Sequence, residues 1–126
     1  MRMLYAFAGL IFLSGAMVYP LREMGLGVWG PWPAFAHAFA FAALWSWPSG
    51  GRLRVFEGVL LVAILSGFEL TQVSAFAPML SDVPFLGPYA RHGTFAINDL
   101  VGGALGVGLW AILACFTQLH MSERGQ

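Results

Sequence analysis

Long apolar runs and short polar breaks alternate along this chain. The apolar runs cover about residues 3–19, 30–47, 55–77 and 94–117. An α-helix rises about 1.5 Å per residue, so about 20 apolar residues cross the ~30 Å hydrocarbon core of a bilayer. The breaks between the runs contain clustered proline and glycine, which end helices. The pattern predicts an all-α fold, with residues 1–126 forming one domain, an integral membrane bundle of four transmembrane helices.

Composition supports the lipid bilayer as the main partner of the chain. Hydrophobic residues make up 59% of the sequence and charged residues 10%, whereas a soluble domain carries about 25% charged residues. The net charge is zero, so no basic face is available for a nucleic acid. The single cysteine, Cys115, excludes an intrachain disulfide and a cysteine-based zinc site.

The first apolar run has two interpretations. Arg2 precedes it, and Ser14, Gly15 and Ala16 lie near its end, as in a cleaved signal peptide. A chain this short needs the helix to complete a bundle, so we expect the helix to be retained, with cleavage as the alternative. Pro20 is expected to end this helix and to start a loop along the membrane interface.

Arginine residues predict the orientation of the bundle. The side that includes both termini and the second loop holds Arg2, Arg52, Arg54 and Arg124. The other side holds Arg22 and Arg91. Because positive residues are enriched in cytoplasmic loops, the distribution favours a multi-pass protein with both termini in the cytoplasm.

Polar side chains at membrane depth mark the candidate site. Glu69, Gln72 and Asp99 lie in otherwise apolar runs, where a charge costs about 2.5–3.5 kcal/mol or more. Counted from the expected helix starts, Glu69 lies about 21 Å along the third helix and Asp99 about 7 Å into the fourth. His37 lies about one turn inside the second helix. Three helices are therefore expected to bring ionisable groups to one depth near the outer leaflet.

Arg91 is the expected counter-charge of this cluster. It lies in the connection before Thr94, a candidate N-cap of the fourth helix. Its guanidinium could bridge Glu69 and Asp99, or hold a phosphate or carboxylate through two hydrogen bonds. A structural network that locks the helices together is the alternative role for the same residues.

Glycines after Asp99 predict a close helix contact. Gly102, Gly103 and Gly106 are expected to let a neighbouring helix approach closely, as in small-xxx-small packing.

His37, Glu69 and Asp99 lack the tight spacing of known metal motifs, so we expect neither a metal nor another cofactor.

The chain resembles the VanZ-like family of small bacterial membrane proteins, named after a teicoplanin-resistance protein. That family has an E-x-x-Q pair, an arginine, a hydroxyl residue, an Asp, an Asn and spaced glycines, and a DK-x-x-H-F entry to an earlier helix. The matching positions, within residues 33–110, are His37, Glu69, Gln72, Arg91, Thr94, Asp99 and Gly106.

The chain also departs from the family pattern. Pro33 and Ala34 replace the Asp-Lys pair, and Gly103 replaces the asparagine if Asp99 is the family aspartate. In the other register Asp99 takes the asparagine position and Phe95 replaces the aspartate. The resemblance implies a four-helix protein of the bacterial cytoplasmic membrane, with a role in the cell envelope and a link to glycopeptide resistance. It implies no established reaction.

Function remains open among three classes. We favour a non-enzymatic protein that binds an anionic lipid or envelope-derived group near the outer leaflet, because the sequence offers an arginine with polar partners and no recognisable nucleophile. A membrane hydrolase or transferase would use Glu69 or Asp99 as general acid or base. A proton-coupled transporter would require a homo-oligomer, because four short helices leave little room for a pathway.

Overall fold

The computed structural model describes residues 1–26, 30–73, 77–80, 82–84 and 96–123. Within these residues all regular structure is helical, which confirms the all-α prediction for the described part of the chain. The elements are α1 (Arg2–Ala16), α2 (Val18–Glu23), α3 (Trp32–Ser46), the 3₁₀ turn η1 (Trp47–Ser49), α4 (Val55–Leu70), α5 (Ala77–Leu80) and α7 (Ile97–Glu123).

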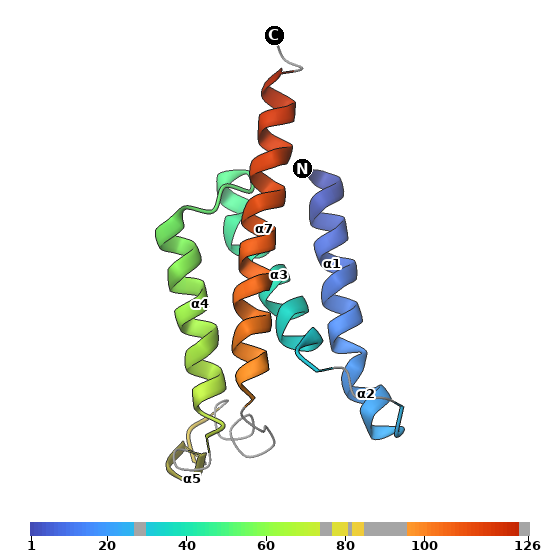
Figure 1. Cartoon of the computed structure of the whole chain (residues 1–126), viewed down its shortest axis with the longest axis vertical. Helices are drawn as coiled ribbons and strands as arrows, with labels where there is room; N and C mark the ends of the chain where they lie inside the picture. The colour runs from blue at the N-terminus through green and yellow to red at the C-terminus, as the bar shows by residue number, and fades with distance from the viewer. Residues whose placement is uncertain (27–29, 74–76, 81, 85–95, 124–126) are drawn as a thin grey trace.

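The long helices lie roughly side by side, and α3 and α7 form the central pair (Figure 1). Helix α1 packs on α3, and α4 packs mainly on α7. The start of α1, η1 and the end of α7 lie at one end of the bundle, which we call the terminal end (Figure 1). The opposite end, which we call the distal end, holds α2, the start of α3, the end of α4 and the start of α7.

Helix α2 lies where the sequence predicted a loop. Pro20 does not end the first helix. Helix α1 ends before Met17, and Pro20 is the third residue of the next helix. A proline in a first helical turn loses no hydrogen bond, since its missing N–H would have no partner within the helix. The Leu21 amide donates to the Met17 carbonyl oxygen at 3.3 Å, so the helical hydrogen bonds continue to Glu23.

The ends of α4 and α7 also differ from the prediction. Helix α4 ends at Leu70 rather than near residue 77, because the amides of Gln72 and Val73 donate to carbonyls three residues back, at 3.0 and 3.2 Å. Such tight turns close a helix. Helix α7 continues to Glu123 rather than ending near residue 117, because residues 118–123 contain neither proline nor glycine.

Small residues hold α3 and α7 close together. A Cβ atom added at Gly102 would lie 2.7 Å from the Pro31 carbonyl oxygen, and one added at Gly106 would overlap the Phe35 carbonyl oxygen. Among the described atoms, none lies within 4 Å of a Cβ added at Gly103. Gly103 therefore takes no part in this close contact, because one residue of helix turns it about 100° away from Gly102.

The core lies between the same two helices. Trp110 and Phe39 are fully buried, and their rings meet edge to face with centroids 5.5 Å apart. The Trp110 Nε1–H donates to the buried Ser46 Oγ at 2.8 Å. A buried indole N–H needs such a partner, so this bond fixes the register of α7 along α3.

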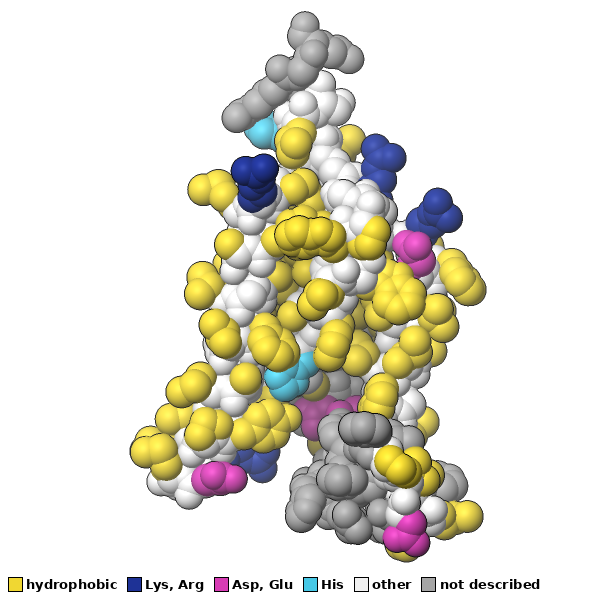
Figure 2. Space-filling view, turned by 180° about the vertical axis from the view of Figure 1, so that it is seen from behind, with side chains coloured by type: hydrophobic (Ala, Val, Ile, Leu, Met, Phe, Trp, Pro, Cys, Tyr) yellow, Lys and Arg dark blue, Asp and Glu magenta, His cyan; other side chains and the backbone are white. Residues whose placement is uncertain are grey.

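Two helical segments, Arg2–Glu23 and Ile97–Ser122, have the length and apolar composition needed to cross a membrane. A core helix of a soluble protein or a signal sequence can have the same properties. Only 17% and 33% of their apolar windows are buried, however, which is low for core helices. Hydrophobic side chains cover much of the outer surface (Figure 2), including Leu10, Leu44, Val55, Phe56 and Phe116. These observations are compatible with a membrane protein.

Candidate functional site

Ionisable side chains from separate helices meet at the distal end of the bundle. Tyr19 lies on α2, His37 in the second turn of α3, Glu69 in the last turn of α4 and Asp99 in the first turn of α7. The Tyr19 hydroxyl is partly buried, and Glu69, Asp99 and Arg22 lie near enough for their charges to reach it. We call these five residues the distal polar cluster. Figure 2 shows histidine and acidic side chains next to one another at this end, among hydrophobic ones.

His37 is held between aromatic rings. Its imidazole stacks on Tyr19, with ring centroids 6.2 Å apart and an interplanar angle of 8°. Phe12 of α1 lies on it as well, with centroids 5.2 Å apart. The side chain is half-buried. The ring is therefore fixed in orientation, while part of it remains accessible.

Helix α1 passes close to α3 beside His37. A Cβ atom added at Gly15 would lie 2.6 Å from the Ala36 Cβ and 3.7 Å from the His37 Nε2. Near the same crossing, the Trp32 Nε1–H donates to the Ser14 Oγ at 3.2 Å. Because Gly15 has no side chain, α1 can approach α3 closely beside His37. The position of Gly15 in the sequence did not reveal this role.

Arg22 is the cation of the cluster in the described part of the chain. Its charge acts on Asp99 as well as on Tyr19. Tyr19 and Arg22 are three residues apart on α2 and therefore share one face of the helix. Sequence reasoning missed both residues because it ended the first helix at Pro20. The tolerance of helices for proline in the first turn was the signal that could have found them.

The two carboxylates lie in different electrostatic environments. Asp99 is in the first turn of α7, where the partial positive charge of the helix N-terminus favours an anion. Glu69 is in the last turn of α4, where the partial negative charge disfavours one, and its side chain is half-buried. Gln72 lies in the turn after α4, and its amide donates to the Glu69 carbonyl oxygen.

Two predicted site residues, Arg91 and Thr94, lie outside the described residues. Their assignments as counter-charge and hydroxyl residue stay predictions. Within the described residues, no three His, Cys, Asp and Glu side chains are grouped so that they could hold a metal ion.

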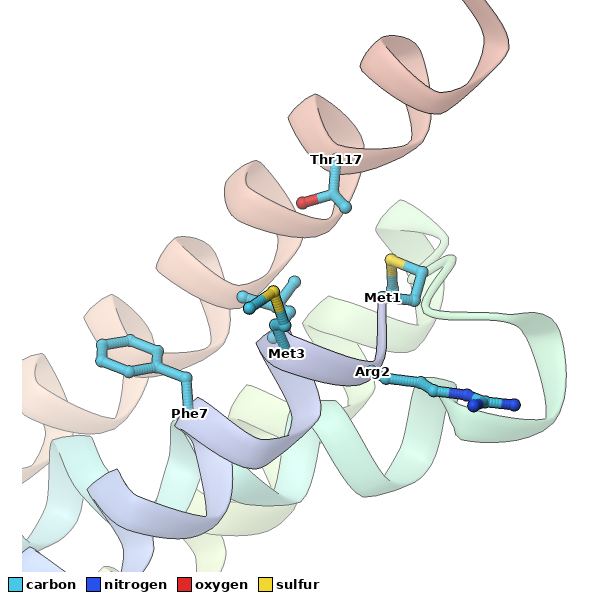
Figure 3. Close-up of a pocket in the computed structure, with 6 residues that line it drawn as sticks. Met1, Arg2, Met3, Phe7 and Thr117 are labelled. Atoms are coloured by element: carbon cyan, nitrogen blue, oxygen red, sulfur yellow. The ribbon is translucent and has the colours of Figure 1, made fainter. Parts of the chain in front are cut away.

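A cleft of about 600 Å³ lies at the terminal end, where Figure 3 shows the residues that line it. It runs between α1 and α7 and is lined by Met1, Arg2, Met3, Leu4, Phe7 and Thr117. No pattern in the sequence predicted this cleft, because it depends on how far α7 extends past the start of α1.

Comparisons of this chain with protein-family models, curated proteins and solved structures found no match. The chemistry of the site is therefore argued from its own groups. The distal polar cluster combines a guanidinium, an imidazole, a phenol and two carboxylates at one end of an apolar bundle. Such a set can bind a charged headgroup through hydrogen bonds or move a proton between neighbouring groups.

Proposed function

We propose that this chain is a multi-pass protein of the bacterial cytoplasmic membrane, crossed by α1–α2, α3, α4 and α7. The exposed apolar surface and the two long apolar segments support this proposal. Helices α3 and α4 have 15 and 16 residues, or about 22–24 Å. Exposed Trp32 at one end of α3 and Trp45 and Trp47 at the other resemble the aromatic belts of membrane proteins. A local thinning of the bilayer accommodates short helices.

The orientation we propose places the terminal end in the cytoplasm. Among the described residues, Arg2, Arg52 and Arg54 lie toward the terminal end and Arg22 toward the distal end. An excess of arginine marks the cytoplasmic side. The distal polar cluster then lies near the outer leaflet.

We further propose that the distal polar cluster binds an anionic group of a lipid-linked or envelope-derived ligand. The observation that carries the proposal is the stacking of the Tyr19 ring on His37, with Arg22 on the same face of α2 as Tyr19. Glu69 and Asp99 lie near enough for their charges to reach the Tyr19 hydroxyl. Arg22 is exposed at the edge of the cluster, where a guanidinium can bind a phosphate through two hydrogen bonds. The resemblance to the VanZ-like family agrees with an envelope role and implies a link to teicoplanin resistance.

The test measures binding of a polyprenyl phosphate, with the uncharged polyprenol as the reference, to the full chain in nanodiscs. The variants are Arg22→Gln and Arg22→Lys, together with Arg91→Ala and Arg91→Lys for the arginine predicted from sequence. Arg54→Gln is the matched control, because it removes one arginine at the other end of the bundle. We expect Arg22→Gln to weaken phosphate-dependent binding about tenfold, as for the loss of a charge-assisted hydrogen bond.

The outcomes separate the alternatives. Equal affinity for the phosphate and the alcohol, or unchanged binding in every Arg22 and Arg91 variant, would contradict an anion site. An equal loss in Arg54→Gln would indicate a general effect of charge. Conversion of the bound lipid to a product that requires both Glu69 and Asp99 would instead support the hydrolase or transferase.

A further inference from the structure

A second site lies at the terminal end, in the clefts between α1 and α7. One cleft has a volume of about 600 Å³ and the adjoining one about 470 Å³, and both are lined by Met1 and Thr117. Figure 3 shows Phe7 and Met3 on the side of α1 near α7, with Thr117 across the gap. The second cleft adds Phe116, His120 and Met121. We treat the two as one surface, the α1/α7 cleft.

The cleft exists because the two helices that form it end at different heights. Helix α7 has 27 residues, or about 40 Å, which is longer than a ~30 Å hydrocarbon core. Its last turns extend beyond the start of α1 (Figure 1). Side chains on those turns, such as Leu119 and Met121, are left 58% and 57% exposed. In the proposed membrane location, these turns reach the level where acyl chains meet headgroups.

The inner lining of the cleft suits a hydrocarbon chain. Met3, Leu4 and Phe7 provide apolar surface along the first two turns of α1. The Thr117 hydroxyl donates to the Leu113 carbonyl oxygen at 2.7 Å, so it needs no polar group from a ligand. Methionine side chains are flexible and adapt to chains of different shape.

The rim of the cleft carries an arginine side chain. Arg2 lines the first cleft and His120 the second, and neither lining includes an aspartate or glutamate among the described residues. In sequence, the acid nearest to the cleft is Glu123, three residues after His120 at the end of α7. Glu57, at the start of α4, accepts a hydrogen bond from the Arg54 amide at 2.7 Å. A long arginine side chain can keep its stem on apolar surface while its guanidinium reaches the headgroup layer.

We infer that the α1/α7 cleft binds an anionic phospholipid, with one acyl chain along Met3, Leu4 and Phe7 and the phosphate near Arg2. Anionic lipids are enriched in the cytoplasmic leaflet, where juxtamembrane arginines attract them. The volume falls within the usual range of ligand sites, ~300–1,000 Å³. The inference rests on the proposed membrane location and orientation and is independent of the ligand of the distal polar cluster.

Native mass spectrometry of the full chain, with phosphatidylglycerol and phosphatidylethanolamine in competition, tests the inference. We expect phosphatidylglycerol to be retained preferentially, and Arg2→Gln to reduce this preference about fivefold. Arg54→Gln is the matched control at the same end. Thr117→Trp should fill the cleft and reduce binding of both lipids, whereas Thr117→Val, which keeps the size of the side chain, should not.

Crosslinking of the unsubstituted protein locates the lipid without relying on any variant. A phosphatidylglycerol with a photoreactive acyl chain should crosslink to the peptides that contain residues 3–7 and 116–121. Crosslinks spread evenly over the helices, crosslinks confined to the distal end, or equal effects of Arg2→Gln and Arg54→Gln would overturn the inference. Crosslinks at the distal end alone would leave the proposed function of the distal polar cluster intact.

Discussion

Single glycines set the spacing of the central helices. Gly102 and Gly106 lie against the backbone of Pro31 and of α3, where an added Cβ atom would come too close to carbonyl oxygens. No described atom lies within 4 Å of a Cβ atom added at Gly103. The i, i+4 spacing of the first pair could be recognised in the sequence. The sequence does not show which of the two adjacent glycines, Gly102 or Gly103, faces α3, because that depends on the position of α3 around α7.

Substitutions at these glycines should have opposite effects. Gly106→Val places a side chain against the Phe35 carbonyl oxygen and should destabilise the bundle by about 1–3 kcal/mol or more. Gly103→Ala meets no described atom within 4 Å and improves helix propensity by up to about 1 kcal/mol. Thermal unfolding of the detergent-solubilised protein measures both. A similar loss of stability in the two variants would contradict the packing described here.

Residues of the candidate site were predictable where they interrupt an apolar run. His37, Glu69 and Asp99 stand out because charged or polar groups are costly at membrane depth. Tyr19 and Arg22 do not stand out, since tyrosine and arginine are common at interfaces and Pro20 lies between them. The cluster as a whole depends on the meeting of α2, α3, α4 and α7, which no local pattern encodes.

At the scale of elements, α2 is the part of the fold that carries the new site residues. The break at Met17 sets the rotation of α2 relative to α1. That rotation brings Tyr19 onto His37 and the charge of Arg22 close to Asp99. Apolar runs predicted the existence of the long helices well, but their ends depend on hydrogen bonds in single turns, as at the end of α4.

Rotation of α2 can be tested by inserting one alanine between Met17 and Val18, which turns α2 by about 100°. In a Cys115→Ser background with cysteines at positions 19 and 37, a short bifunctional thiol reagent should crosslink the parent protein. The insertion should abolish the crosslink. An alanine inserted between Glu23 and Met24, after α2, should leave it unchanged. Persistent crosslinking after the first insertion would contradict a rigid, helical α2.

At the scale of the whole molecule, the terminal and distal ends carry different chemistry. Arg2, Arg52 and Arg54 belong to the terminal end, and the distal polar cluster lies at the other. The alternation of the long helices follows from the order of the apolar runs and was predictable. The proposed orientation rests only on the distribution of arginine.

Orientation is tested by labelling single cysteines in intact cells, again in the Cys115→Ser background. Glu23 and Ser49 are exposed at the distal and terminal ends. A membrane-impermeant thiol reagent should label a cysteine at position 23 and should label one at position 49 only after the cells are opened. The reverse pattern would invert the molecule and move the distal polar cluster to the cytoplasmic leaflet.

The pairing of α3 with α7 also bears on how the chain assembles during synthesis. Helix α3 finds its main partner in α7, the last helix that the structure describes, and α4 packs mainly on that same helix. Before α7 is present, α4 has few contacts with α3. Phe39 then also lacks the Trp110 ring that covers it. The bundle therefore closes only when α7 is present, and a nascent chain halted before Ile97 would leave the surfaces of α3 and α4 that pack on α7 uncovered.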